Sequence, residues 1–102
     1  MDDDLWSKDL FNKWSKDNAD SKEIIKIMQA IHLLMDGCTD NLTRSQLETI
    51  QGQMKSTIQQ CIFWQKQDNR SRFIYDLREF GTWLADFITE AQEKFWENEN
   101  NS

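Results

Sequence analysis

The sequence predicts an all-α protein, a helical bundle of three to four helices built on a long antiparallel helical hairpin. Its composition is the first reason, because the chain has no Pro, no Val and only three Gly, a profile that favours helix over sheet. Its periodicity is the second reason, because apolar residues recur at helical spacing in four segments. A length of 102 residues fits a single helical domain, residues 1–102, around one core.

The first two expected helices are short and cover residues 5–17 and 21–36. Trp6, Leu10 and Trp14 recur every four residues and share one face of the first segment. The two segments either stack end to end and cover the long hairpin, or fold back on each other and leave part of it bare. The sequence does not decide between these arrangements.

Helix ends are predicted from capping residues. Thr43 followed by Gln46 makes a capping box at the start of the third helix. Asp20 followed by Glu23 suggests an acidic version of the same motif at the start of the second. Gly37 is expected to end that helix in the left-handed conformation that glycine adopts without penalty.

The long hairpin consists of the segments 44–67 and 70–97, about 36 and 40 Å in length. The turn signal at 67–71 is short, so the two helices must run antiparallel. Polar residues 98–102 are expected to form a frayed tail. The core stripe of the last helix contains residues at helical spacing: Phe73, Leu77, Phe80, Leu84, Phe87, Ile88, Ala91 and Phe95.

Small residues recur in both arms of this hairpin. Gly52 falls opposite Ala85, and Ser56 falls opposite Gly81, when residues are counted outward from the turn. Two interpretations stay open. Either the small residues allow a close approach of the two helices, or they are unrelated glycines at tolerant positions.

A net charge of −6 and a pI near 4.6 indicate a protein partner with a basic surface. The same charge argues against direct binding to nucleic acid, whose phosphates it repels. No apolar run is long enough to span a membrane, and the acidic start Met-Asp-Asp-Asp does not resemble a signal peptide. We therefore expect a cytoplasmic protein with reduced cysteines.

Catalytic and metal-binding groups are sparse. His32 is the single histidine, and Asp36 is its nearest ligand partner at helical spacing, which is too little for a metal site. Cys61 falls on an apolar stripe and is expected to be an inert buried thiol. Cys38 has no basic neighbour in sequence that would activate it. We expect no catalytic residues, no cofactor and no metal, and therefore no enzyme.

One face of the segment 70–97 is unusually acidic. Seven residues follow one another at spacings of three and four, which keeps them on a face well over 100° from the core stripe. Six are acidic and the seventh is tryptophan: Asp76, Glu79, Trp83, Asp86, Glu90, Glu93 and Glu97. This acidic row is either a tolerated solvated face or a binding site for a basic partner. Trp83 favours binding as a potential hot spot, unless it packs over one of the first two helices.

The hairpin tip is a second candidate surface. Cys61-Ile62-Phe63-Trp64 is a run of four apolar residues that one helix face cannot bury. Glutamines recur every seven residues beside Trp64. The surface comprises Phe63, Trp64, Gln60, Gln67 and Tyr75, unless the first helix covers the tip and buries both rings.

These features favour a small acidic binding protein that inhibits or regulates a macromolecular partner with a basic site. The partner is expected to be a nuclease, a nucleic-acid-guided complex or a DNA-binding protein. In size, acidity and helical character the chain resembles bacteriocin or toxin immunity proteins and phage inhibitors such as anti-CRISPRs, a likeness of type without a shared motif. The alternative is a structural or adaptor subunit that self-associates through the tip. The oligomeric state, monomer or homodimer, stays open.

Overall fold

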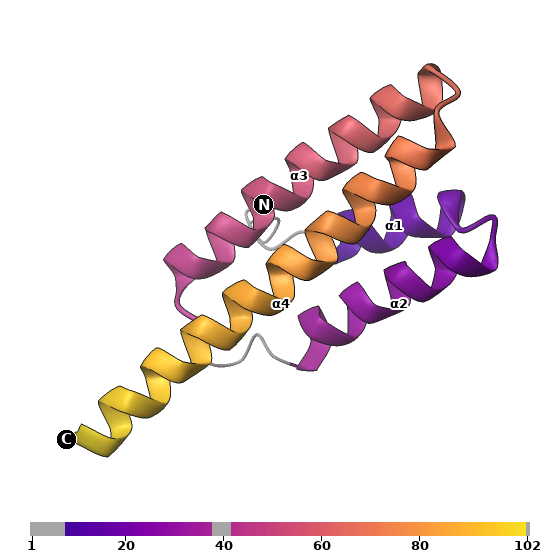
Figure 1. The fold of residues 1–102 in the computed structure, drawn as a ribbon. Helices are drawn as coiled ribbons and strands as arrows, with labels where there is room; N and C mark the ends of the chain where they lie inside the picture. The colour runs from indigo at the N-terminus through magenta and orange to yellow at the C-terminus, as the bar shows by residue number, and fades with distance from the viewer. Residues whose placement is uncertain (1–7, 38–41, 102) are drawn as a thin grey trace.

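The computed structural model describes residues 8–37 and 42–101, and these form four α-helices without a strand (Figure 1). The helices are α1 (Lys8–Asn18), α2 (Lys22–Gly37), α3 (Arg44–Lys66) and α4 (Arg70–Asn101). The all-α bundle is confirmed, and α3 and α4 form the expected long hairpin. Residues 5–7 of the first predicted helix lie outside the described residues.

The turn between α3 and α4 occupies residues 67–69. Asp68 has a φ of 58°, a left-handed conformation that Asp tolerates better than most residues. The amide of Asn69 donates to the carbonyl of Trp64 at 2.9 Å, which closes the end of α3. The side chain of Asn69 then accepts from the amide of Arg72 at 3.2 Å and caps α4. The tight reversal therefore satisfies backbone groups at both helix ends.

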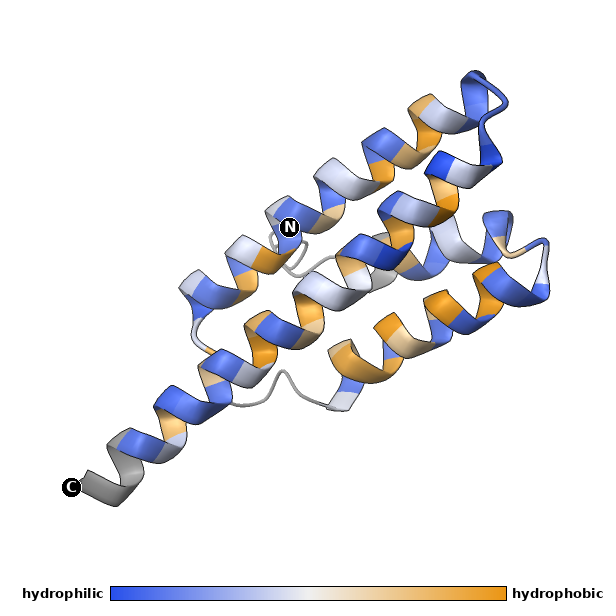
Figure 2. Ribbon diagram, in the orientation of Figure 1, coloured by the Kyte–Doolittle hydropathy of each residue, from blue (hydrophilic) through white to orange (hydrophobic). Residues whose placement is uncertain are grey.

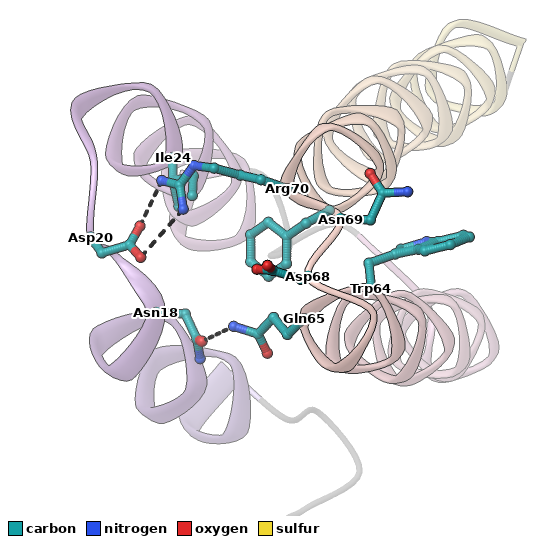
Figure 3. A pocket seen from close by; sticks show the side chains of 9 residues that line it. Asn18, Asp20, Ile24, Trp64, Gln65, Asp68, Asn69 and Arg70 are labelled. Atoms are coloured by element: carbon teal, nitrogen blue, oxygen red, sulfur yellow. Dashed lines mark hydrogen bonds and ion pairs between the residues drawn. The ribbon is translucent and has the colours of Figure 1, made fainter.

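The helices α1 and α2 fold back on each other rather than stacking end to end. Viewed near the hairpin tip, the four helices form a bundle in which α1 lies beside α3 and α2 beside α4 (Figure 3). The much longer α4 continues past the other three and projects from the bundle (Figure 1). Its 32 residues span about 48 Å, close to the molecule's longest dimension of 53 Å.

The core lies between the two helical hairpins, and hydrophobic residues line the sides of the helices that face one another (Figure 2). Most of the predicted α4 stripe is buried, from Phe73 to Ala91. The prediction for Phe95 is wrong, because its side chain is 40% exposed. α3 has 23 residues against 32 in α4, so Phe95 falls where α4 has outrun its partner helix.

The capping box at the start of α3 is confirmed. The amide of Thr43 donates to Oε1 of Gln46 at 2.8 Å, and the amide of Gln46 donates to Oγ1 of Thr43 at 3.1 Å. Each side chain thereby satisfies an amide that the first turn of a helix leaves without a partner.

The acidic capping box predicted at the start of α2 is wrong. Ser21 caps this helix instead, because its Oγ accepts from the amide of Ile24 at 3.3 Å. The carboxylate of Asp20 instead forms an ion pair with the guanidinium of Arg70 at 2.9 Å. These residues are 50 positions apart, so the sequence around Asp20 does not reveal the interaction.

The left-handed end predicted at Gly37 is wrong, and of the two interpretations of the hairpin glycines the structure favours unrelated positions. Gly37 belongs to α2, and no glycine in the described residues has a positive φ. Gly81 faces α2 rather than α3, since a Cβ at this position would lie 3.5 Å from Cγ1 of Ile31. A Cβ at Gly52 would meet nothing within 4 Å. The two glycines therefore do not mediate a close approach of α3 and α4.

The predicted frayed tail is helical as far as Asn101. The sequence after Gly81 contains neither Pro nor Gly, the two residues that most disfavour a helix. Within residues 8–37 and 42–101, no helix combines the length and apolarity needed to cross a membrane.

Candidate partner-binding surface

The acidic row lies along α4, and the structure divides it into two parts. Asp76 and Trp83 are half-buried at the margin that faces α3. The other five members are exposed: Glu79, Asp86, Glu90, Glu93 and Glu97. Trp83 is therefore at an edge of the row, and the exposed carboxylates continue from it toward the projecting end of α4.

Trp83 packs on two aromatic residues of its own helix. Its ring lies 6.0 Å from that of Phe80 and 5.0 Å from that of Phe87, with interplanar angles of 21° and 18°. The stack joins Trp83 to the hydrophobic core while leaving part of the side chain accessible. The tryptophan is thus rigidly held, a property that lowers the entropy lost when a partner contacts it.

A surface hollow of about 310 Å³ lies between α3 and α4 beside Trp83. Polar groups of α3 form one wall, and α4 contributes two carboxylates and two aromatic rings to the other. Its lining residues are Gln53, Ser56, Thr57, Gln60, Asp76, Glu79, Phe80 and Trp83. Members of the glutamine row therefore face members of the acidic row across one depression.

Trp64 and Asp76 connect the two surfaces that the sequence suggests separately. The indole Nε1 of Trp64 on α3 donates to Oδ2 of Asp76 on α4 at 2.6 Å. The guanidinium of Arg72 lies over the Trp64 ring at 5.1 Å and over the Tyr75 ring at 5.8 Å. The tip and the acidic row are consequently one continuous surface along the groove between α3 and α4.

The first helix does not bury the aromatic tip. Phe63 is 48% exposed and Tyr75 is 53% exposed. Trp64 is half-buried, with its ring 4.9 Å from that of Phe63 in an edge-to-face arrangement. α1 instead directs Trp14 toward Phe73, at 5.9 Å between ring centroids. Gln60 and Gln67 are exposed beside this tip.

A second hollow, of about 170 Å³, lies where the two interhelical turns meet (Figure 3). Arg70 binds Asp20 across it, and Gln65 donates to Asn18 (Figure 3). The hydrogen bond from Arg70 lowers the pKa of Asp20, and Asp20 raises the pKa of Arg70. These contacts link the turn between α1 and α2 to the end of α3 and the start of α4, and they leave the polar groups of the hollow paired with one another.

The histidine and the described cysteine are placed for packing. His32 lies 4.9 Å from the Phe11 ring and 3.2 Å from Oγ of Ser15, and burial lowers its pKa. Burial raises the pKa of Cys61 to about 12, and Asp76 adds to the effect. Cys38 lies outside the described residues. Within the described part of the chain, no group of three His, Cys, Asp or Glu residues is arranged to hold a metal ion.

Sequence reasoning missed the two most exposed large hydrophobic residues of the described chain and the hollow beside Trp83. Leu33 is 73% exposed on α2, and Trp96 is 63% exposed near the end of α4. Neither residue lies at the helical spacing of the core residues, so the sequence does contain a signal that could have identified them as exposed. The hollow has no such signal, since it depends on how two helices are set against each other.

The fold and the surface together define a small acidic four-helix protein with a polar and aromatic groove. No family model, curated protein or solved structure matches the chain.

Proposed function

We propose that this chain is a non-enzymatic binding protein that inhibits or regulates a macromolecular partner with a basic site. The binding surface is the groove between α3 and α4 together with the exposed acidic row. The observation that carries the proposal is the hollow in which Asp76, Glu79 and Trp83 face Gln53 and Gln60. It joins charge, a rigid aromatic residue and neutral hydrogen-bonding groups on one surface.

The arrangement of charge supports a basic partner. Carboxylates at spacings of three and four residues repel one another by a few tenths of a kcal/mol per pair. A surface rich in Lys and Arg would relieve this repulsion and steer association over long range. Trp83 would supply contact area that the charges lack, because partly desolvated tryptophans often dominate binding energy.

The dimensions of the row favour binding to a site on the partner that would otherwise bind nucleic acid. From Asp76 to Glu97 the row covers about 32 Å of helix, with a side chain every 4.5 to 6 Å or so. A line of Lys and Arg residues that binds successive phosphates would meet acidic groups along this helix. The candidate partners are therefore a nuclease, a nucleic-acid-guided complex or a DNA-binding protein, with the chain acting in the manner of an immunity protein or an anti-CRISPR.

Self-association is the second candidate function, favoured by exposed aromatic residues. Phe63 and Tyr75 at the tip leave about half of each side chain accessible. A structural or adaptor subunit would bury them against a second copy. Sedimentation equilibrium of the wild type and of Phe63→Ser with Tyr75→Ser tests this role. A wild-type monomer at concentrations near 100 μM, where an interface of micromolar affinity is occupied, would exclude it.

Quantitative affinity capture from candidate host cells tests the primary proposal. The chain is used as bait beside Glu90→Lys with Glu93→Lys, and beside Asp17→Lys with Glu48→Lys. Both double variants have the same net charge, but only the first alters the row. Glu48 lies about 140° around α3 from Gln53, outside the groove.

We expect a basic protein that the wild type and the control variant retain and the row variant loses. The purified pair should then lose affinity as salt rises from 50 to 300 mM. If both double variants lose the partner equally, binding depends on net charge alone and not on the acidic row. Equal retention in both would overturn the proposal.

A further inference from the structure

We propose that the hollow between α3 and α4 is a socket for one arginine side chain of the partner. This inference rests on the proposed function and specifies the chemistry at its centre. A charged row attracts any cation, whereas a lined depression selects by shape and by hydrogen-bonding groups. The occupant follows from the groups that line each wall.

Two carboxylates stand on the α4 side of the socket. Asp76 and Glu79 are three residues apart, so adjacent turns direct them to the same depression. Asp76 already accepts from Trp64, but a carboxylate has about four acceptor positions and retains room for further donors. The side chain of Glu79 has no hydrogen bond or ion pair to another residue in the ranges that the structure describes. Both groups are available to a planar donor with several N–H bonds.

The remaining walls favour arginine over lysine. Gln53 and Gln60 offer amide oxygens across from the carboxylates, and the half-buried Trp83 offers apolar surface. A guanidinium presents five N–H donors in one plane and is less strongly hydrated than an ammonium group. Its methylene stem can lie on the accessible part of Trp83 while its head bonds to the oxygens. Lysine, a compact and strongly hydrated charge, would use fewer of these groups.

The chain itself contains a related arrangement at the rim of the groove. The guanidinium of Arg72 lies 5.1 Å from the centre of the Trp64 ring, and the same indole donates to Asp76. A guanidinium, an aromatic ring and a carboxylate are thus already combined beside the socket. The hollow repeats these elements with the guanidinium left for a partner to supply.

Two peptides of equal charge test the socket: acetyl-Lys-Lys-Lys-Arg-Lys-Lys-Lys-amide and its all-lysine counterpart. Binding is followed by NMR titration in 20 mM salt, observing the side-chain amides of Gln53 and Gln60. Gln59 is exposed and lies about 100° around α3 from Gln60 and about 120° from Gln53, outside the lining of the hollow, so it is the internal control. We expect the arginine peptide to bind at least about fivefold more tightly, and to shift Gln53 and Gln60 but not Gln59.

Two conservative variants separate the socket from the rest of the row. Glu79→Gln should abolish the preference for arginine, whereas Glu90→Gln should weaken both peptides equally and retain it. Equal affinity for the two peptides in the wild type would overturn the socket and leave a charge-driven acidic row intact. Failure of both peptides to bind would count against the socket and the proposed function together. Both glutamates are exposed, so neither substitution removes a core contact.

Discussion

The indole of Trp64 donates a hydrogen bond to the carboxylate of Asp76, at 2.6 Å, and thereby ties the last turns of α3 to the first turns of α4. Both side chains are half-buried, so the bond is partly protected from competing water. It also fixes one wall of the groove that includes Trp83. Its loss should therefore affect both stability and the shape of the candidate binding surface.

Trp64→Phe should lower the free energy of unfolding by about 1 kcal/mol, because it removes a hydrogen bond to a charged acceptor while keeping an aromatic ring. Urea denaturation followed by circular dichroism measures the change. Trp96→Phe is the matched control, since Trp96 is 63% exposed, and it should alter stability by less than about 0.5 kcal/mol. Equal effects of the two variants would contradict a structural role for the bond.

Cys61 should be almost unreactive in the folded protein. Its pKa is raised from 9.0 to about 12, so at pH 8 the thiolate fraction falls about a thousandfold below that of an ordinary cysteine. A Cys38→Ser background isolates Cys61 for labelling with a disulfide reagent. We expect labelling to be at least about a thousandfold slower in buffer than in 8 M urea. Rapid labelling without denaturant would show that the core opens around α3.

His32 should make stability depend on pH. Burial lowers the pKa of folded His32 below its usual value of 6.5, so the unfolded chain binds the proton more readily. The stabilisation is present above pH 6.5 and is lost as the pH falls toward the lowered folded pKa. His32→Gln should flatten the decline in unfolding free energy between pH 7.5 and 5.5. If the unfolding free energy of His32→Gln falls with pH as steeply as that of the wild type, other titratable groups cause the decline.

Gly81→Ala should stabilise the protein by about 0.5 to 1 kcal/mol, because alanine has the higher helix propensity. The added methyl group would meet Ile31 at 3.5 Å, an ordinary contact distance. Gly52→Ala should give a similar gain, since open space surrounds that position. Thermal unfolding measures both effects. A loss of stability at Gly52 would restore the view that small residues bring α3 and α4 together, whereas a loss at Gly81 would show that α2 leaves no room for the methyl group.

Periodicity predicted which face of each helix is buried, but it did not predict where along the helix that face is no longer covered by another helix. From Phe73 to Ala91 the predicted stripe is buried except at Phe87, which is partly buried. Phe95 follows the same spacing and is exposed because α3 is too short to cover it. Local motifs behaved similarly. The cap at Thr43 uses neighbours in sequence and was correct, while Asp20 was captured by a residue 50 positions away.

The candidate site was predictable as a list of residues but not as a shape. Spacing placed Asp76, Glu79 and Trp83 on one helical face, and the recurrence of glutamines placed Gln60 on another. Their meeting across a hollow depends on the rotation and separation of two helices. The rotation and separation of the helices are set by packing of the core residues. The pattern of exposed polar residues in the sequence carries no information about them.

The projecting end of α4 carries a further consequence, because a helix C-terminus bears partial negative charge. Glu93 and Glu97 add like charge near this end, and the last turn contains no basic residue that would offset it. Helical order in this extension should therefore increase with ionic strength, as added salt screens the repulsion. A basic partner would act in the same direction as salt, so that binding and the tightening of the last turns of α4 become one coupled event.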